Sequence, residues 1–510
     1  MTATAPTAPG AGGLTTWRAA TRDPYVRALL AITVLAAVVR FAVIGIPSFW
    51  PDEGFTIRIL DGSLSHALHT IPDTESTPPL YYVLAWGWST VWGTSEDGVR
   101  SLSALCGVLT VPVVAAAASR LVDRRTGLVA AALVAANPFL IWFAEEARAY
   151  ALMVLLAAIG FSLFVRFLDR PDRRTLLWWT VASALLLCTH YYGVLMIGAE
   201  AGWLLVAARP GTRGRIVAAL AGVGAVGVAL LPLVAKQRNN DFATPLAENS
   251  STFIRTLQVP KQFAIGFDAP AEALLAAVCL ALAAAGLALL VTRRSPAERA
   301  RLHPAAFVGV IVLVIPVFLG AVGYGFVSAR YEVPALVPLT ICVAAGFAAP
   351  RAARLGLALA AALVAIWLGI VIAVAADPLL QTRGDWRNAA KALGPVPPGG
   401  RAIVVTPATG RTSLQLYLPG ARPITTPVVS VSEIDVLTMR STKDEALGTL
   451  AKPPGTVQTG LPPSFKETGR TRTRAYLIVR YRSAGPATVP LTNFGGLRLD
   501  DLDWVALQER

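Results

Sequence analysis

Long apolar stretches separated by short polar links make up most of this 510-residue chain, up to about residue 376. A helix needs about 20 apolar residues to cross the hydrocarbon core of a bilayer. The stretches that come near or exceed this length are 27–47, 99–119, 127–143, 149–168, 175–189, 191–207, 216–235, 271–292, 305–326, 332–349 and 353–376. The pattern therefore predicts an α-helical polytopic membrane domain over residues 27–376, with about 11 transmembrane helices.

Residues 78–93 form a further apolar stretch of a different kind. As a helix this stretch would reach roughly 24 Å, which is short of the hydrocarbon core. It is also rich in aromatic side chains, which favour the membrane–water interface: Tyr81, Tyr82, Trp86, Trp88 and Trp92. We expect an interfacial helix here rather than a span.

The charge of the links sets the expected orientation. With the N-terminus inside, every inner link is basic, as in Arg120, Arg124 and Arg125 or in Arg209, Arg213 and Arg215. The outer segments hold few cations, which is the distribution that the positive-inside rule produces. If 78–93 were counted as a span, every later link would lie on the opposite side of the membrane, against this distribution of charge.

This topology divides the chain into parts. Residues 1–26, rich in Ala, Thr, Pro and Gly, are expected to be a disordered cytoplasmic leader. The first outer loop covers 48–98, and another outer loop covers 236–270. The polar tail, 377–510, is expected to lie outside the cytoplasm.

The tail has the pattern of a small α/β domain. Residues 385–393 (DWRNAAKAL) resemble a short helix, and residues 402–406 and 475–482 have the β-branched or alternating pattern of strands. Pro and Gly interrupt the chain around 394–400 and 453–463.

Composition narrows the class of protein. The chain is 55% hydrophobic and 15% charged, whereas soluble domains carry about 25% charged residues, so an ordinary soluble enzyme is excluded. The net charge of +14 could indicate a nucleic-acid partner. Because most arginines of the membrane half lie in inner links, we attribute the charge to orientation in a lipid bilayer and expect no nucleic acid. The excess of Arg over Lys favours a bacterial plasma membrane.

Charged side chains near the outer ends of spans are costly there and often functional. Asp52 and Glu53 follow the first span in FWPDEGFT. A carboxylate at this boundary could serve as a general base, or it could cap the N-terminus of a helix.

A second acidic and basic group lies between the third and fourth predicted spans. Glu145, Glu146, Arg148 and Tyr150 occur in FAEEARAYAL. Arg148 could bind a phosphate in a bidentate manner, or it could pair with a neighbouring glutamate.

Further candidates occur in the remaining outer segments. His190 and Tyr191 stand in CTHYYG, where a polar or phosphate contact is favoured over a metal ligand, and Arg330 and Tyr331 stand in SARYEVPAL, where Glu332 is the alternative partner of the arginine. The outer segments also offer candidate substrate contacts at Glu145, Glu146, Tyr81, Tyr82, Arg58 and Lys261.

An outer base together with outer cations indicates one kind of chemistry. The cations could hold a phosphate at the membrane surface, and the carboxylate could deprotonate an incoming hydroxyl. A lipid-linked phosphosugar meets both conditions, and attack in one displacement would invert the anomeric carbon.

The motifs PDEGFT, TPPLYYVL, VRSLSAL, EEARAYAL, THYY and ARYEVPALVPL, in this order, resemble the GT-C superfamily of membrane glycosyltransferases. The chain is most similar to the bacterial branch of glycosyltransferase family 39, the protein O-mannosyltransferase-like branch. The resemblance implies a polyprenyl-phosphate sugar donor and a cell-envelope acceptor outside the cytoplasm. It implies Asp52 as the base with Glu53 beside it.

The same resemblance implies further roles and limits. Donor or phosphate contacts would come from Arg148, Tyr150, His190, Tyr191, Arg330 and Tyr331. Mannose is the favoured sugar. The outer loops lack repeated acidic DxD motifs, so no metal or other cofactor is predicted.

Two other classes of protein are compatible with parts of the pattern. A transporter or flippase of lipid-linked sugars would have a comparable number of spans, but usually with internal repeats and charges near the midplane. A non-catalytic polysaccharide-binding scaffold is the second alternative. The sugar and the acceptor stay open at this point.

Overall fold

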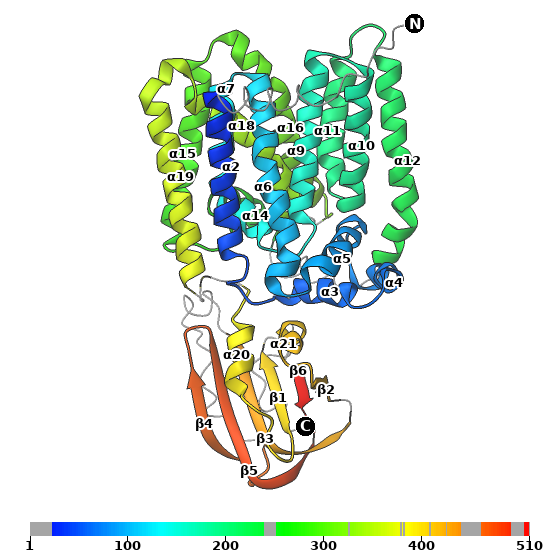
Figure 1. The fold of residues 1–510 in the computed structure, drawn as a ribbon, viewed down its shortest axis with the longest axis vertical. Coiled ribbons are helices and arrows are strands. Elements are labelled where there is room, and N and C mark those ends of the chain that lie inside the picture. Colours follow the sequence, from blue (N-terminus) through cyan, green and yellow to red (C-terminus); the bar gives the residue numbers. More distant parts are fainter. Residues whose placement is uncertain are drawn as a thin grey trace, which may run out of the picture.

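The computed structural model describes residues 23–238, 251–324, 327–377, 380, 383–406, 410–424, 426–439, 461–490 and 504–508. It consists of a bundle of long helices and, at one end of the bundle, a domain built around a β-sheet (Figure 1). The start of the first helix and the sheet domain lie at opposite ends of the bundle. Most of the predicted leader, residues 1–22, lies outside the described residues.

All the predicted spans form helices that stand side by side in Figure 1. Their bounds are α2 (Pro24–Val43), α6 (Glu96–Leu121), α7 (Arg124–Ala136), α8 (Pro138–Ala144), α9 (Tyr150–Asp169), α10 (Arg173–Thr189), α11 (Gly193–Val206), α12 (Arg213–Gln237), α15 (Glu272–Arg293), α16 (Pro296–Ala321), α17 (Ala329–Glu332), η2 (Val333–Ala335), α18 (Leu336–Phe347), η3 (Pro350–Ala352) and α19 (Ala353–Ala376). The chain is a multi-pass membrane protein, as predicted.

The number of full-length spans is smaller than the predicted number. Within the described ranges, eight helical segments are long and apolar enough to cross a membrane by themselves, and a bent pair raises this to nine. The other two predicted spans are shorter helices, because α10 has 17 residues and α11 has 14. Both pack against α9 and α12.

The bent pair is the third predicted span. Helices α7 and α8 meet at an angle of 60° on either side of Asn137. Asn137 caps α8 by accepting a hydrogen bond from the Leu140 amide, and Pro138 occupies the first helical position, where its missing N–H costs nothing. The Asn137 side chain also donates to the Phe263 carbonyl at 3.0 Å. The break turns α8 toward the interior of the outer half of the bundle.

Another boundary differs from the prediction. We predicted a span at 305–326, whereas α16 begins at Pro296. Ser295 and Glu298 form a reciprocal capping box that starts the helix early. Arg299 and Arg301 are therefore on the first turns of a helix rather than in a link.

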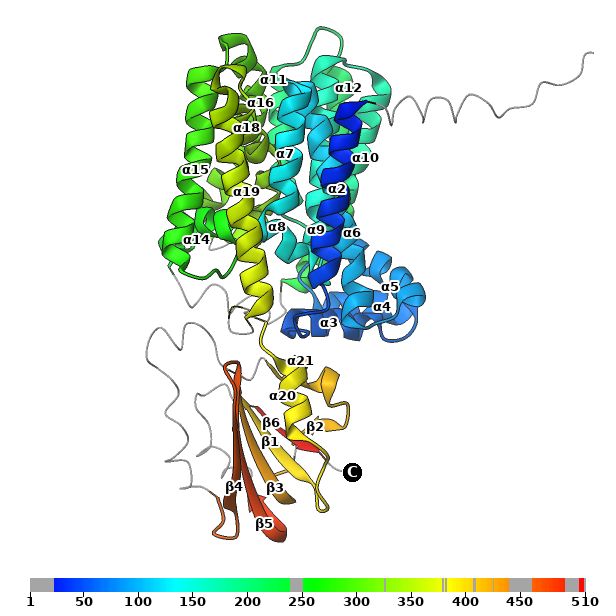
Figure 2. The same ribbon diagram turned by 60° about the vertical axis from the view of Figure 1, so that its left-hand side comes forward.

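The predicted first outer loop folds into three short helices, α3 (Pro51–Leu60), α4 (Leu64–Thr74) and α5 (Leu80–Trp92), which gather at the end of the bundle nearest the tail (Figures 1 and 2). We keep the word outer for this predicted side. Large apolar side chains on α4 and α5 are exposed, among them Leu68, Leu84, Val91 and Trp92. An exposed apolar surface at this level suits the membrane interface. The helix predicted at 78–93 is confirmed as α5, and its place at the membrane interface stays a prediction.

The outer loop at 236–270 also contains a helix, α14 (Thr252–Ile265). This helix packs against α8, α15 and α17. Its C-terminal residues Phe263, Ala264 and Ile265 are buried. Residues 239–250 of this loop lie outside the described residues.

The tail is a small α/β domain, as predicted. Its strands are β1 (Arg401–Thr406), β2 (Ala421–Pro423), β3 (Val428–Met439), β4 (Lys466–Arg472), β5 (Tyr476–Pro490) and β6 (Trp504–Gln508), in the order β2-β6-β1-β3-β5-β4. Strands β1 and β3 are parallel, and the other pairs are antiparallel. Helices α20 (Trp386–Leu393) and α21 (Arg411–Tyr417) share a buried apolar cluster with the sheet.

The tail is attached to the membrane part by specific polar contacts. Arg387 of α20 pairs with Glu96, the first residue of α6, at 2.7 Å, and donates to the Gly45 carbonyl at 3.0 Å. Tyr417 of α21 donates to the same carboxylate at 2.6 Å and accepts a hydrogen bond from the Phe49 amide. Figure 2 shows α20 and α21 between the sheet and the helix bundle.

Candidate active site

Asp52 lies in the first turn of α3, directly after the Pro51 that begins the helix. The position before the helix belongs to Trp50, whose amide donates to Glu53 Oε2 at 3.4 Å. Glu53 thus takes the capping role that the sequence left open for Asp52. The Asp52 side chain keeps about a third of its surface exposed, at 33%, and stands at the positive end of a helix dipole.

Glu53 is enclosed in a buried ion pair. Arg100 of α6 donates through Nε and Nη2 to the two carboxylate oxygens of Glu53, at 2.7 and 2.6 Å, and both side chains are fully buried. The Ala147 amide also donates to Glu53 Oε1 at 2.9 Å. Although burial raises the pKa of Glu53, the Arg100 guanidinium outweighs it and holds this pKa below its usual value. In place of the catalytic role predicted for Glu53, we propose that Glu53 supports the position of its neighbour Asp52.

Arg100 also fixes the chain that leads into α3. Its Nη1 and Nη2 donate to the carbonyls of Ile44, Pro47 and Ser48 at 2.7, 2.7 and 3.0 Å. The fork of one guanidinium thus joins the end of α2, the start of α3 and α6. This sets the position of Asp52 against the bundle.

Arg148 is held by a partner that the sequence did not indicate. Its two Nη atoms donate to the two oxygens of Glu75, at 2.5 and 2.7 Å. Nη1 also donates to the Asp52 carbonyl at 3.2 Å, and the guanidinium lies over the Tyr82 ring. The charge of Arg148 is thus already paired, by a carboxylate 73 residues away.

Tyr81 and Tyr82 are fully buried in this packing. The Tyr81 hydroxyl shares a hydrogen bond with Ser103, and the Tyr82 hydroxyl shares one with Thr77. Both side chains support the first outer loop rather than face an open space.

The segment 145–149, between α8 and α9, carries two unusual carboxyl groups. Glu146 is 1% exposed, and neither of its oxygens has a hydrogen-bond partner among the described residues. Burial raises the pKa of Glu146 to about 7 against the charge of Arg383, and Asp52 adds to the rise. Burial likewise raises the pKa of Glu145 to about 7. Glu146 is therefore protonated part of the time near neutral pH.

This shift predicts a pH-dependent stability. Because the folded pKa of Glu146 lies above the usual 4.5, its protonated form favours the folded state, and this contribution is lost as the pH rises from about 4.5 to 7. The loss is on the order of 3 kcal/mol. We expect Glu146→Gln to gain thermal stability relative to the unaltered protein as the pH rises from 5 to 7.5, measured as the unfolding midpoint in detergent.

The matched control for this measurement is Glu467→Gln on the exposed strand β4, which should show no such pH-dependent gain. Equal pH dependence in Glu146→Gln and the unaltered protein would contradict the assignment.

His190 lies between α10 and α11 in a group of aromatic rings. Its ring centroid is 5.6 Å from those of Tyr150 and Tyr331, and Tyr331 stacks on Tyr192 at 4.4 Å. The site therefore has an aromatic wall.

The protonation of His190 follows from its surroundings. Burial, and then the charges of Arg148 and Arg330, lower the pKa of His190 to about 3, so the ring is neutral. Nδ1 accepts from the Tyr192 amide at 3.2 Å, which leaves the proton on Nε2. Nε2 is buried and has no partner among the described residues, so it is a hydrogen-bond donor available to a ligand.

Arg330, on α17, brings these parts together. Its Nη1 lies 3.5 Å from Asp52 Oδ2, and its side chain is 19% exposed. Asp52 is thus its ion-pair partner among the described residues. Among the described residues, Arg330 makes this one long ion pair and no hydrogen bond, unlike Arg148, so its guanidinium could turn toward an added anion.

The other predicted contacts lie apart from this group. Arg58 is exposed at the far end of α3 and contacts the Phe55 ring. Lys261 donates to the Phe267 carbonyl and pairs with Glu272, at the turn between α14 and α15. Tyr191 donates to Gln237, whose amide in turn donates to the Thr77 carbonyl. Tyr191 therefore ties two outer segments together.

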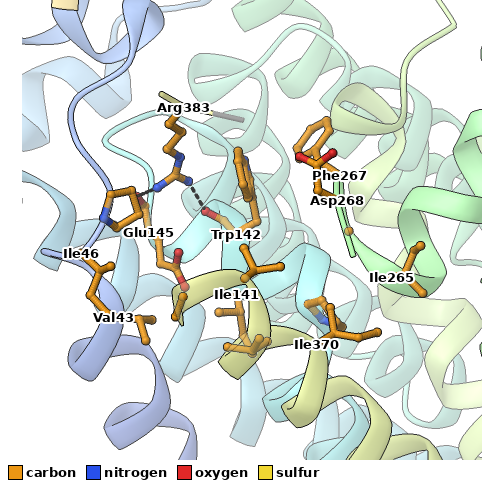
Figure 3. A pocket seen from close by; sticks show the side chains of 16 residues that line it. Val43, Ile46, Ile141, Trp142, Glu145, Ile265, Phe267, Asp268, Ile370 and Arg383 are labelled. Atoms are coloured by element: carbon orange, nitrogen blue, oxygen red, sulfur yellow. Dashed lines mark hydrogen bonds between the residues drawn. The ribbon is translucent and has the colours of Figure 1, made fainter. Parts of the chain in front are cut away.

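A pocket with about 530 Å³ of space, part of it open to the surroundings, lies beside Glu145, between the ends of α2, α8, α14 and α19 that are nearest the tail. Its walls are mostly apolar, and Glu145, Asp268 and Arg383 are its charged residues. Figure 3 shows Arg383 at one end of this pocket, joined to Trp142 and Glu145. In the part of the chain that the structure describes, no three His, Cys, Asp or Glu side chains converge to hold a metal ion.

Several supporting residues could not be singled out from the sequence. No role for Arg100 or Glu75 was predicted. A buried arginine in an apolar helix needs a partner, and this rule could have directed attention to Arg100. No pattern in the sequence indicated a role for Arg383, because it is an isolated residue in a polar linker.

Comparison with known proteins agrees with this architecture. The family described as dolichyl-phosphate-mannose-protein mannosyltransferase matches residues 76–235. The crystal structure of ArnT from Cupriavidus metallidurans bound to undecaprenyl phosphate matches with a TM-score of 0.55 and 14% identity, over 88% of this chain and 97% of ArnT. ArnT in the apo state matches with the same TM-score and 13% identity, over 92% of this chain and 98% of ArnT. Among curated proteins, none matches the chain as a sequence relative.

The likeness to ArnT shows a shared fold. The predicted resemblance to GT-C membrane glycosyltransferases is therefore confirmed for the fold, and residues 76–235 carry the sequence pattern of the mannosyltransferase family.

Proposed function

We propose that this protein transfers a sugar from a polyprenyl-phosphate donor to a hydroxyl group of an acceptor outside the cytoplasm. The observation that carries the proposal is the position of Asp52. Its partly exposed carboxylate faces Arg330 at the outer end of a GT-C fold. A base and a cation next to each other at the membrane boundary suit an acceptor hydroxyl and a lipid phosphate.

In the proposed reaction, Asp52 accepts the proton of the acceptor hydroxyl. The hydroxyl oxygen forms a bond to the anomeric carbon, and the bond from that carbon to the phosphate oxygen breaks. The electron pair leaves with polyprenyl phosphate, and the proton stays on Asp52 until it passes to water. One displacement of this kind inverts the anomeric carbon.

The donor phosphate is assigned to Arg330 and the Nε2–H of His190. Both groups have unused capacity, because Arg330 has one long ion pair and His190 Nε2 has no partner among the described residues. Tyr150 and Tyr331 flank His190 and could contact the sugar. Arg148, which the sequence suggested for this role, is better placed to hold Glu75 and the Asp52 carbonyl.

The sugar and the donor are inferred from similarity to known proteins, and the orientation from the charge of the links. The name of the matching family supports mannose as the sugar. The ArnT structure holds undecaprenyl phosphate, which supports a lipid-phosphate donor. The basic inner links support an orientation with the N-terminus in the cytoplasm and the tail outside a bacterial plasma membrane.

The direct test is an assay of the purified full-length protein with a panel of polyprenyl-phosphate sugars. We expect release of polyprenyl phosphate that depends on an acceptor hydroxyl, and a product with inverted anomeric configuration. Transport of an intact lipid-linked sugar across vesicles without bond cleavage would instead support the transporter or flippase alternative.

A second test separates the two arginines. Because Arg330 would make charge-assisted hydrogen bonds to the phosphate, Arg330→Ala should weaken binding of undecaprenyl phosphate about 10- to 100-fold with little change in unfolding midpoint. Arg148→Ala should mainly lower the midpoint, since it removes the positive charge that faces the buried Glu75 carboxylate. Binding can be measured by titration in detergent.

Arg120→Ala is the matched control, because Arg120 lies at the inner end of α6 and is 40% exposed. Unchanged affinity in Arg330→Ala would contradict the phosphate assignment.

A further inference from the structure

Arg383 belongs to the linker after the last span, yet its side chain is almost completely buried in the membrane part, with 1% exposure. Nη1 donates to the Glu145 carbonyl at 2.8 Å, and Nη2 donates to the Trp142 carbonyl at 3.0 Å. The guanidinium lies 4.1 Å from the centre of the Trp142 ring. Figure 3 shows this contact at the end of the pocket.

These contacts provide hydrogen-bond donors for carbonyl groups at the C-terminal end of helix α8. The last carbonyls of any helix lack intrahelical partners, and a positive charge is favourable at that end. Helix α8 has only seven residues and ends at Ala144. Arg383 binds the Glu145 carbonyl just past this end and the Trp142 carbonyl of the last turn, which also accepts from the Glu145 amide at 3.1 Å. Because the site is buried, water would be a poor substitute for this donor. Arg383 therefore caps α8 from a distant part of the chain.

The segment that Arg383 holds leads directly to the candidate base. The Ala147 amide donates to Glu53, the residue after Asp52, and Arg148 donates to the Asp52 carbonyl. Thr56 of α3 also donates to the Ala147 carbonyl at 2.9 Å. The end of α8, the 145–149 segment and the first turns of α3 thus form one connected set of hydrogen bonds.

We propose that Arg383 is a positioning residue for sugar transfer, and that the tail domain takes part in the active site through it. This inference rests on the proposed function. Arg383 acts by fixing the 145–149 segment and, through it, the place of Asp52 relative to Arg330. It does not touch the reacting groups itself.

The linker is built to hold this side chain in place. Gly384 follows with a φ of 73°, a conformation that favours glycine, and a Cβ there would lie 2.9 Å from Trp386 Nε1. Asp385 then caps α20 by accepting from the Asn388 amide at 3.4 Å. The turn therefore connects Arg383 rigidly to a helix of the tail domain.

An arginine suits this position better than a lysine. The planar guanidinium serves two carbonyls and stacks on a ring at once, whereas an ammonium on a flexible stem cannot do all three. Arg383→Lys should therefore restore little of what Arg383→Ala removes.

The test uses the full-length protein with Arg383→Ala, Arg383→Lys and, as a matched tail arginine, Arg387→Ala. A misplacement of about 1 Å can cost about 100-fold in rate. We expect Arg383→Ala to lower kcat by about this factor and to change KM for the donor by less than about 3-fold. Arg474→Ala, an exposed arginine of the tail, should leave activity unchanged.

A second readout does not depend on substrate. Hydrogen exchange at the Ala147 amide, which donates to Glu53, should become faster in Arg383→Ala and should stay unchanged in Arg387→Ala. If Arg383→Ala does not fold, the same comparison is made with Arg383→Lys.

The outcomes separate the two proposals. A normal kcat, or unchanged exchange at Ala147, in a folded Arg383 variant would overturn the positioning role. If the unaltered protein transfers no sugar from any donor, the proposed function fails, while the exchange result still decides whether Arg383 holds this segment.

Discussion

Replacing Asp52 by asparagine is expected to lower sugar transfer by about 1,000-fold while the protein still folds. The loss is that of a general base, which typically contributes between 100- and 10,000-fold. Asparagine keeps the size of the side chain but cannot accept the proton of the acceptor hydroxyl. Stability should change little, because Asp52 makes a partly exposed ion pair at 3.5 Å, and such pairs contribute about 0–1 kcal/mol.

The measurement is the transfer rate of purified Asp52→Asn, together with its unfolding midpoint. Asp73→Asn is the matched control, because Asp73 lies in the same outer loop, is 61% exposed and pairs with Lys236. Its rate should equal that of the unaltered protein. Full transfer by Asp52→Asn would refute the assignment of the base.

Replacing Arg100 by alanine is expected to lower the free energy of unfolding by about 3–5 kcal/mol and to reduce the yield of folded protein sharply. Removing one partner of a buried pair leaves the other charge without compensation. Here the Glu53 carboxylate would be left fully buried, and the carbonyls of Ile44, Pro47 and Ser48 would lose the hydrogen bonds that Arg100 donates.

The double variant Glu53→Gln/Arg100→Met should recover part of this loss, because no unpaired charge is then buried. Arg470→Ala is the control, since Arg470 pairs with Glu467 on an exposed strand and should change the midpoint little. Comparable midpoints for Arg100→Ala and Arg470→Ala would show that the buried pair is not structural.

The helices of the bundle could be predicted because hydrophobic length and link charge are local properties of the sequence. The aromatic residues of 78–93 correctly separated α5 from the spans. The bend at Asn137 was missed, although an Asn-Pro pair inside an apolar stretch is a recognisable helix start. The short helices α10 and α11 were counted as spans because their stretches, 175–189 and 191–207, are almost entirely apolar although both are below about 20 residues.

The candidate site was predicted less completely, because its arrangement depends on which charged side chains meet in three dimensions. Both Arg148 and Arg330 stand near an outer glutamate in the sequence. Only the fold shows that Arg148 forms an ion pair with Glu75 and that Arg330 faces Asp52. The sequence likewise offered both Asp52 and Glu53 as bases, and the fold assigns Glu53 to Arg100.

The tail shows a similar limit. Strand β3 was not predicted, because Glu433 and Asp435 interrupt its apolar pattern. Both carboxylates are buried in the sheet, where Arg401, Arg480 and Arg482 pair with them. A strand with charged residues at buried positions cannot be recognised until their partners on other strands are known.

The contacts of Arg383, Arg387 and Tyr417 also bear on what counts as a folding unit in this protein. Among the described residues, the buried carboxylates of the tail's sheet are paired within the tail. The two parts nevertheless depend on each other. The carbonyls of Gly45 and Glu145 and the carboxylate of Glu96 accept hydrogen bonds from the tail, and the buried Arg383 of the tail finds acceptors in the membrane half. A chain cut where the hydropathy changes, near residue 377, would break these contacts, so the cooperative unit extends past the boundary that hydropathy marks.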